Sequence, residues 1–270
     1  MRPLALAALL TAFAAPVAGA QAPDAFAAAA IRPNTSGGGT TSVQVLPGGR
    51  FVADNITFKE LIRAPYQFEL EPSQIVGGPG WIETERFDIQ ATAGGDATPA
   101  QVLAMVRSMM AERFGLVSRR DRRDMGVFRL VVARQDGRLG PGLKRSAGEC
   151  TPRAVTRGGS APPEPGMPVC GFSYLPDIGD VQRHVGTGVT LDDLVRQLRR
   201  HAGGIVTDHT GLTGRYDLTL DYLPPSVNPQ QGNGVSLFTA VQEQLGLRLE
   251  SGREPIEVLV IEKAERPTPN

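Results

Sequence analysis

An internal repeat limits the possible folds of this chain more than any other feature of its sequence. Four blocks recur in the same order about 130 residues further on, with only small insertions and deletions between them. One block alone is weak evidence, because helices resemble one another and so do strands. Four blocks in register favour a duplicated unit over coincidence. The pairs are NITFKELIR (55–63) with GVTLDDLVR (188–196), RFDIQATA (86–93) with RYDLTLDY (215–222), RFGLVSRR (113–120) with QLGLRLES (244–251), and VFRLVVAR (127–134) with IEVLVIEK (256–263).

Each copy of the repeat alternates between helix-like and strand-like patterns. A capping box at Thr57–Glu60 and a Thr-Pro start at Thr98 each precede an apolar helical stripe. The order in each copy is β-α-β followed by β-α-β-β, over about 80 to 90 residues. Helices between strands need a sheet to cover. We therefore predict an α+β fold of two tandem duplicated units, each a small mixed sheet with two helices.

The end of each copy predicts a pair of strands. In the first copy, GLVSRR and GVFRLVVAR flank the charged turn DRRD at 121–124. In the second copy, GLRLE and PIEVLVIEKA close the chain. Each pair is typical of two strands within its own unit.

Composition divides the chain into four segments. Residues 1–20 have a basic start, an apolar run and a small-x-small site ending at Ala20, which is typical of a cleaved signal peptide; an uncleaved anchor helix is the alternative. Residues 21–135 form the first α+β unit, and residues 185–270 form the second. Residues 136–184 are rich in Gly, Pro and Ser, which predicts a partly irregular insert. No later stretch approaches the ~18 apolar residues of a membrane span, so we expect a periplasmic or secreted protein.

The charge and the cysteine content limit the kinds of partner that we expect and indicate the compartment in which the protein acts. The formal net charge is zero, so no global field favours nucleic acid or an anionic membrane. The only cysteines, Cys150 and Cys170, fit one disulfide in an oxidising compartment. A metal pair or a reactive thiol is less well supported, because the nearest histidine is His184. Closing a loop of about 20 residues would stabilise the fold by roughly 3 kcal/mol.

The stretch VTDHTGLTGRYDLTL at 206–220 contains a turn similar to a catalytic motif. Asp208-His209-Thr210-Gly211 resembles the Asp-Thr-Gly turn of aspartic proteases, but a His interrupts it and the first copy has no matching carboxylate. One Asp cannot form a pair of like-charged carboxylates. A turn in which Asp208 accepts hydrogen bonds from nearby amides is favoured. An extracytoplasmic hydrolase built around Asp208 and His209 is the alternative.

The sequence contains no further motif for catalysis, a metal or a cofactor. The three histidines, His184, His201 and His209, do not have the spacing of a metal site. No serine lies in a G-x-S-x-G elbow, and no glycine-rich loop has phosphate-cradling spacing. We therefore expect no catalytic residue, no metal and no cofactor, and an enzymatic role is not favoured.

Two arginine clusters and the single tryptophan are the remaining candidates for binding. The clusters lie at 119–123 and 196–201 and could face an anionic polymer, although interleaved or preceding Asp residues favour solvated, locally paired faces. Trp81 follows the GGPG turn and is either an exposed anchor for a partner or a packed side chain at the sheet edge; packing is favoured. Arg215 begins the repeated Arg-aromatic-Asp strand. The candidate binding residues are Trp81, Asp208, His209 and Arg215.

Several motifs together resemble an exported protein family of unknown function from soil bacteria, whose genomes carry many copies. They are AIRPN, PGGRFVADNITFKELIR, GGPGWIETERFDIQATA, AERFGL, VTDHTGLTGRYDLTL, SLFTAVQEQLGLRLES and PIEVLVIEKAERP. In some relatives a similar segment follows a membrane metallopeptidase of the antibiotic-sensor type, which implies sensing or interaction outside the cytoplasm. This chain has no H-E-x-x-H motif. Each repeat is also loosely similar to the short N-terminal signalling domain of secretins and TonB-dependent receptors, which binds protein partners.

These observations lead to one functional expectation. We expect an exported, non-enzymatic binding or interaction module of the cell envelope, with a role in sensing or signalling. Its partner would be an envelope protein or a cell-wall component, bound at an exposed sheet edge or in the groove between the two units. We expect no nucleic-acid partner and no transmembrane segment in the mature chain.

Overall fold

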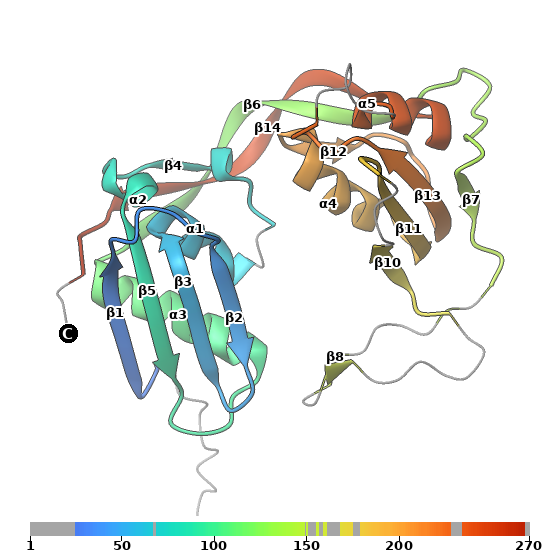
Figure 1. The fold of residues 1–270 in the computed structure, drawn as a ribbon. Helices are drawn as coiled ribbons and strands as arrows, with labels where there is room; N and C mark the ends of the chain where they lie inside the picture. Colours follow the sequence, from blue (N-terminus) through green and yellow to red (C-terminus); the bar gives the residue numbers. More distant parts are fainter. Residues whose placement is uncertain are drawn as a thin grey trace, which may run out of the picture.

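The fold has two lobes joined by a long β-ribbon. The computed structural model describes residues 25–66, 69–148, 150, 155–156, 159–160, 168–174, 179–227 and 234–267. Within this part the fold is α+β, as predicted, with five α-helices and three four-stranded sheets. Two of these sheets belong to separate lobes, and the third is the ribbon between them (Figure 1). The predicted signal peptide, residues 1–20, lies outside the described residues.

Lobe 1 is a four-stranded antiparallel sheet with helices packed against it. Its strands, in spatial order, are β1 (Ala28–Asn34), β5 (Arg86–Thr92), β3 (Arg50–Thr57) and β2 (Ser42–Leu46). Its helical segments are α1 (Phe58–Arg63), α2 (Trp81–Thr84), α3 (Pro99–Phe114) and the 3-10 turns Ala64–Tyr66 and Pro72–Gln74. The predicted capping box of α1 is confirmed, because the Glu60 amide donates to Thr57 Oγ1 at 3.2 Å and the Thr57 amide donates to Glu60 Oε2 at 2.9 Å.

Aromatic side chains fill the core of lobe 1. Phe58 stacks on Phe114 with ring centroids 4.3 Å apart. Phe87 meets Phe114 edge to face at 5.6 Å. All three rings are buried, and burying one phenylalanine contributes roughly 1.5–3 kcal/mol. The stack therefore fixes α1, α3 and β5 relative to one another.

Lobe 2 is a second antiparallel sheet with its own helices. Its strands, in spatial order, are β10 (Gly171–Tyr174), β11 (Gln182–Val189), β13 (Tyr216–Tyr222) and β7 (Leu143–Arg145). Its helices are α4 (Leu191–Ala202) and α5 (Leu237–Ala240), the latter continued by a π turn at Val241–Leu245, and a separate small sheet pairs β8 (Val155–Thr156) with β9 (Gly159–Ser160). Both edge strands, β7 and β10, come from the 136–184 segment, so the described part of the insert contributes to the lobe.

The core of lobe 2 includes polar side chains among its leucines. His184 is only 3% exposed. Its Nδ1 lies 2.8 Å from the amide nitrogen of Gln197, and its Nε2 lies 3.0 Å from the Tyr222 hydroxyl. An amide nitrogen can only donate, so the neutral His184 ring accepts at Nδ1 and donates from Nε2 to Tyr222. The buried imidazole therefore has a partner at each ring nitrogen.

The ribbon consists of two strands far longer than those of the lobes. Strand β6 (Val117–Val132) pairs antiparallel with β14 (Leu247–Lys263) along almost its whole length. The predicted turn at 121–124 is therefore wrong, since the chain continues straight through it. Cross-strand ion pairs offset the charge of this stretch: Arg120 contacts Glu257 at 2.9 Å, and Arg253 contacts Asp124 at 2.7 Å.

The ribbon completes each lobe with a strand from the other half of the chain. Strand β12 (Val206–Asp208) pairs in parallel with the end of β6, where Val206 lies opposite Phe128. Strand β4 (Ile75–Gly77) pairs in parallel with the end of β14, where Ile75 lies opposite Leu259. These parallel pairs lie in the shared sheet, whereas a mixed sheet was predicted inside each unit. Leu130 of β6 belongs to the core of lobe 2, and Leu259 of β14 belongs to the core of lobe 1.

Candidate functional site: the cleft between the lobes

Trp81 lies in the aromatic core of lobe 1. Its side chain is 8% exposed, and its ring centroid lies 5.4 Å from that of Phe58. The Arg266 guanidinium covers the ring at 5.7 Å from the centroid and forms an ion pair with Glu85 at 2.6 Å. This arrangement corresponds to the packed alternative of the sequence prediction, and it leaves little of the indole accessible to a partner.

Asp208 and His209 lie at the end of β12 and point to different neighbours. Asp208 Oδ1 accepts a hydrogen bond from the Thr210 amide at 2.8 Å, which is the turn predicted for it. His209 Nε2 lies 2.8 Å from Glu254 Oε1, and Arg129 Nε reaches the same oxygen at 2.7 Å. Burial would raise the pKa of Glu254, but the Arg129 hydrogen bond and the charge of His209 outweigh it and lower the pKa.

The contact between His209 and Glu254 lies at the surface between β12 and the ribbon. The His209 side chain is 46% exposed. Neither partner of the pair lines the cleft described below.

Arg215 forms part of a backbone latch in lobe 2. Its Nη1 donates to the carbonyl oxygen of Gly188 at 2.6 Å. From the same strand, Asp217 Oδ1 accepts from the Gly188 amide at 2.8 Å. Gly188 has a left-handed φ of 55° and lies where the register between β11 and β13 shifts, just before the α4 cap Thr190. Arg215 therefore fixes a β-bulge that starts the helix.

Lobe 1 has a latch of the same construction. Arg86 Nη1 donates to the carbonyl oxygen of Asn55 at 2.5 Å, and Asp88 Oδ1 accepts from the Asn55 amide at 2.9 Å. Asn55 has a φ of 53°, which asparagine tolerates better than most residues, and it lies at the register shift between β3 and β5. The repeated Arg-aromatic-Asp motif is thus explained by backbone structure in both lobes.

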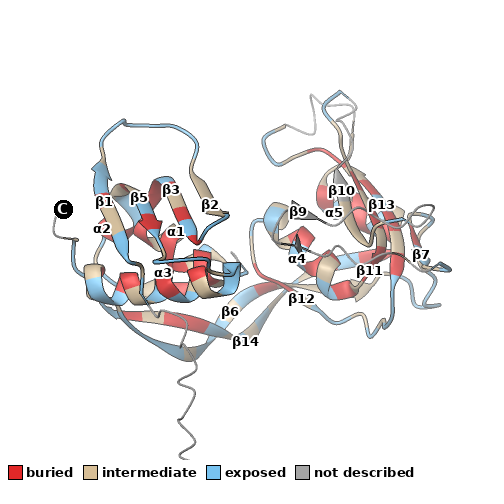
Figure 2. Ribbon diagram, turned by 90° about the horizontal axis from the view of Figure 1, so that it is seen from below, coloured by how far each residue is buried: buried red, intermediate tan, exposed pale blue. Residues whose placement is uncertain are grey.

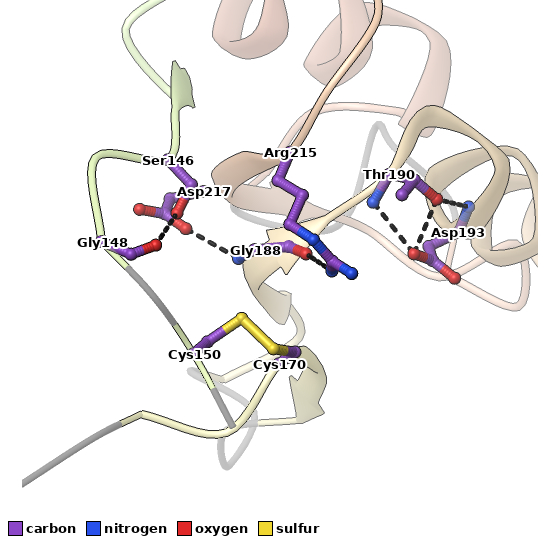
Figure 3. Close-up of a disulfide and its surroundings, with 9 residues drawn as sticks. All are labelled: Ser146, Gly148, Cys150, Cys170, Gly188, Thr190, Asp193, Arg215 and Asp217. Atoms are coloured by element: carbon purple, nitrogen blue, oxygen red, sulfur yellow. Dashed lines mark hydrogen bonds between the residues drawn. A yellow bond between two sulfur atoms is a disulfide. The ribbon is translucent and has the colours of Figure 1, made fainter. Parts of the chain in front are cut away.

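The predicted disulfide lies against the latch of lobe 2 (Figure 3). Cys150 and Cys170 are bonded, with their Cα atoms 5.1 Å apart and a sequence separation of 20. A Cβ on Gly188 would overlap Cys150 Sγ, so the position opposite the disulfide accepts only glycine without a shift. The disulfide therefore closes a loop within the 136–184 segment and places Cys150 Sγ against Gly188, just before α4.

The described residues contain no group of three or more His, Cys, Asp or Glu side chains placed to hold a metal ion. The same part of the chain contains no helix long and apolar enough to cross a membrane.

A cleft lies where lobe 1, lobe 2 and the ribbon meet. It consists of two adjoining hollows of about 300 and 700 Å³, which share Glu69 and Arg199 as lining residues. Lobe 1 contributes the segment around Glu69 and Glu71, and the ribbon contributes Arg120. Helix α4, the helix of lobe 2 that faces lobe 1 in both views, contributes Arg199 (Figures 1 and 2). Each of the two predicted arginine clusters thus reaches this cleft.

Charged groups in the cleft are partly buried across from one another. Burial lowers the pKa of Arg199, while the charges of Glu71 and Glu69 oppose this shift. Burial raises the pKa of the Glu71 carboxyl, which Arg63 and Arg199 oppose. Burial also lowers the pKa of Arg63. Partly desolvated charges in a cleft are a mark of binding sites, although ion-pair networks can produce the same shifts.

Two arginines of the larger hollow donate to backbone carbonyl oxygens. Arg199 donates from Nε and Nη2 to the carbonyl oxygen of Val206, at 3.0 and 2.8 Å. Arg63 donates from Nε to the carbonyl oxygen of Leu70 at 2.6 Å. Among the described residues, Glu71 has no ion pair within 4.0 Å, so its carboxylate faces the cleft without a basic side chain bound to it.

Sequence reasoning found one wall of the cleft and missed the other. The α4 arginines were singled out as a basic cluster. The sequence does not mark Arg63, Glu69 and Glu71, because Arg63 ends a short helix, the two glutamates follow it, and no charge pattern connects the three. Of the four predicted binding residues, the structure brings none into the cleft.

Comparison with known proteins identifies a family. No curated protein and no solved structure gives a significant match. A family model described as "Protein of unknown function (DUF3738)" matches residues 59–264. This range includes the described part of lobe 2, the ribbon and the cleft, and it begins after strands β1, β2 and β3 of lobe 1. Because the match spans well over half of the chain, the protein belongs to the DUF3738 family.

Proposed function

We propose that this protein is an exported, non-enzymatic binding module of the cell envelope, with a role in sensing or signalling, and that it binds its partner in the cleft between the lobes. The partner would be an envelope protein or a cell-wall component. The observation that carries the proposal is that Arg199 and Glu71 face the same cleft from different lobes, partly buried and without an ion pair between them. A ligand with polar groups would bind between these two side chains.

Export is proposed on two grounds. Residues 1–20 have the pattern of a cleaved signal peptide. The Cys150–Cys170 disulfide is a bond typical of an oxidising compartment. Both grounds support the periplasm or the extracellular medium as the site of action.

We also infer that the two lobes are copies of one unit that have exchanged their closing strands. Three equivalences support this: the latched residues Asn55 and Gly188, the capping boxes that follow them, and the reciprocal parallel pairing of β4 and β12 with the ribbon. The Gly/Pro-rich segment 136–184 would then be an insert between the copies. In this arrangement the exchange holds the lobes in one relative position and so sets the width of the cleft.

A capture experiment tests the proposed binding site. The immobilised protein would be exposed to an envelope extract of the source organism, next to an Arg196→Gln/Arg200→Gln double variant. Both arginines line the larger hollow, so the variant is expected to lose the captured component. Arg138→Gln is the matched control, because Arg138 is an exposed arginine outside the cleft lining. Equal capture by all three proteins would contradict the proposal.

Enzymatic activity of the purified protein would also contradict the proposal of a non-enzymatic binding module. If the purified protein turned over wall or ester substrates and His209→Ala removed that turnover, the hydrolase alternative built around Asp208 and His209 would replace the binding proposal. The same turnover assay on Arg196→Gln/Arg200→Gln shows whether an activity belongs to the cleft or to the turn at Asp208 and His209.

A further inference from the structure

The larger hollow of the cleft has an excess of positive charge. Four arginines, Arg63, Arg196, Arg199 and Arg200, and two glutamates, Glu69 and Glu71, contribute charged side chains to its lining. Three of the arginines come from α4, and Arg63 comes from α1 of the other lobe. The guanidinium groups therefore approach the hollow from two directions.

The bonds that the α4 arginines already make leave donors for a ligand. Arg196 is paired with Asp193, and Arg199 is held by the carbonyl oxygen of Val206. Among the described residues, the Arg200 side chain has no ion pair or hydrogen bond, although its charge lowers the pKa of neighbouring His201. A guanidinium has five N–H donors, so Arg199 retains donors beyond the two groups used at Val206. The α4 arginines are thus held in place and still have N–H donors for a ligand.

A solvated basic helix face is the simpler explanation of these arginines, and Arg63 and Glu71 argue against it. The pKa shifts of Arg199, Arg63 and Glu71 each have burial as the largest cause. Charges on an open helix face would remain fully hydrated and would not be desolvated in this way. Arg199 therefore belongs to a partly buried surface that spans both lobes, and the exposed Arg196 and Arg200 lie beside it in the lining of the same hollow.

We propose that the cleft binds a phosphate group, held between the α4 arginines and Arg63; this inference rests on the proposed function and names the chemistry of its ligand. Arginine forks match the oxygens of phosphate in bidentate fashion. A tetrahedral phosphate presents oxygens in several directions and so suits donors that converge from two lobes, whereas a planar carboxylate presents two oxygens in one plane. Glu69 and Glu71 would lie beside the group and accept from hydroxyl or amide donors of the rest of the ligand.

Calorimetric titration of the full-length protein tests this inference. The probes are inorganic phosphate and glycerol 3-phosphate at low ionic strength, with malonate as a dicarboxylate without a phosphoryl group for comparison, and salt is added at the end because it screens charge. Arg196→Gln/Arg200→Gln is expected to weaken phosphate binding by about tenfold or more, since charge-assisted hydrogen bonds are lost. Arg138→Gln should leave phosphate binding unchanged. Arg200→Lys should weaken phosphate binding less than Arg196→Gln/Arg200→Gln does, because lysine keeps the charge but lacks the planar guanidinium fork.

A second arm separates a lipid headgroup from a soluble phosphate. Cosedimentation with phosphatidylglycerol vesicles, compared with phosphatidylcholine vesicles, shows whether the group can be bound at a membrane surface. Saturable binding of either phosphate source that depends on Arg196 and Arg200 supports the inference. Equal binding of malonate, or binding that the double variant leaves intact, overturns it.

The capture experiment distinguishes failure of the phosphate inference from failure of the proposed envelope-binding function. If the cleft variant loses the envelope component but no phosphate source binds, the cleft is a binding site for another chemistry and only the phosphate inference is overturned. If phosphate binds in the cleft but nothing is captured from the envelope in a cleft-dependent manner, the phosphate site stands and the envelope-binding proposal is contradicted.

Discussion

The two lobes share a backbone device but differ in what surrounds it. Both fix a left-handed residue between an Arg and an Asp from the neighbouring strand, at Asn55 in lobe 1 and Gly188 in lobe 2. In lobe 1 the Asn55 side chain donates to the Gly39 carbonyl oxygen at 2.9 Å. In lobe 2 the same space is taken by Cys150. Each left-handed residue therefore contacts a segment that precedes it in the chain, through a hydrogen bond in lobe 1 and through packing against Cys150 in lobe 2.

The cores differ more than the latches. Lobe 1 is built on stacked aromatic rings, whereas lobe 2 buries a His184–Gln197–Tyr222 hydrogen-bonded group and has α4, with its arginines, facing the cleft. Lobe 1 contains no histidine. The two lobes therefore share the latch and differ in the side chains of their cores. Lobe 2 carries most of the basic side chains of the candidate site.

The largest expected effect tests whether the lobes unfold as one. Phe114→Ala in lobe 1 and Leu245→Ala in lobe 2 each remove a fully buried side chain and should lower the free energy of unfolding by about 3–5 and 2–5 kcal/mol. Trp81, the only tryptophan, reports on lobe 1. Because the ribbon contributes to both cores, Leu245→Ala should shift the Trp81 fluorescence transition in urea as well. A Trp81 transition that Leu245→Ala leaves in place would show that the lobes are independent.

The disulfide should give the next largest effect, and it concerns lobe 2 directly. Replacing both Cys150 and Cys170 by Ser opens a loop of about 20 residues and is expected to cost roughly 3 kcal/mol of unfolding free energy by the chain-entropy estimate. Guanidinium denaturation of the oxidised protein and the double variant measures the difference. Thiol titration of the unreduced, denatured wild-type protein is the control, and two free thiols there would refute the disulfide.

The latches should respond to the same substitution in the same way. Asp88→Ala leaves the buried Asn55 amide without its acceptor, and Asp217→Ala does so for Gly188. Each should cost about 1–3 kcal/mol, the penalty for an unsatisfied buried donor. Asp54→Ala, at an exposed aspartate of β3, is the control and should change stability by less than about 0.5 kcal/mol. A large cost at one latch and none at the other would break the equivalence of the lobes.

The smallest effect is a pH dependence that His201 of lobe 2 should contribute. Burial and the charge of Arg200 lower the pKa of His201. The unfolded chain therefore binds this proton more readily than the folded one, and stability should fall as the pH drops below about 6.5. His201→Gln should reduce this loss, by less than about 1 kcal/mol because the side chain is partly solvated. Denaturant titrations between about pH 5 and 7.5 measure it, and an unchanged slope in His201→Gln would contradict the assignment.

Much of the local structure could be predicted from the sequence, because local chemistry determines it. Thr57 and Thr98 mark their helices through capping boxes that form as expected. The ribbon could not be predicted, because a strand that turns at 121–124 and one that runs straight have the same period and the same pairing groups. The choice depends on which partner strand is available, and that is a property of the whole chain. Glu71 was missed for the same reason, since the lobe opposite it is distant in sequence.

Site-specific photocrosslinking tests the central claim, that the cleft is where this protein binds, most directly. A benzophenone amino acid would replace Ser73, an exposed residue next to Pro72 in the cleft lining, and in a second protein Ala104, an exposed residue of α3 outside that lining. Irradiation in the source organism should give a defined adduct at Ser73, which Arg196→Gln/Arg200→Gln abolishes, and none at Ala104. An adduct at Ala104 alone, or one at Ser73 that survives loss of both arginines, would contradict the account.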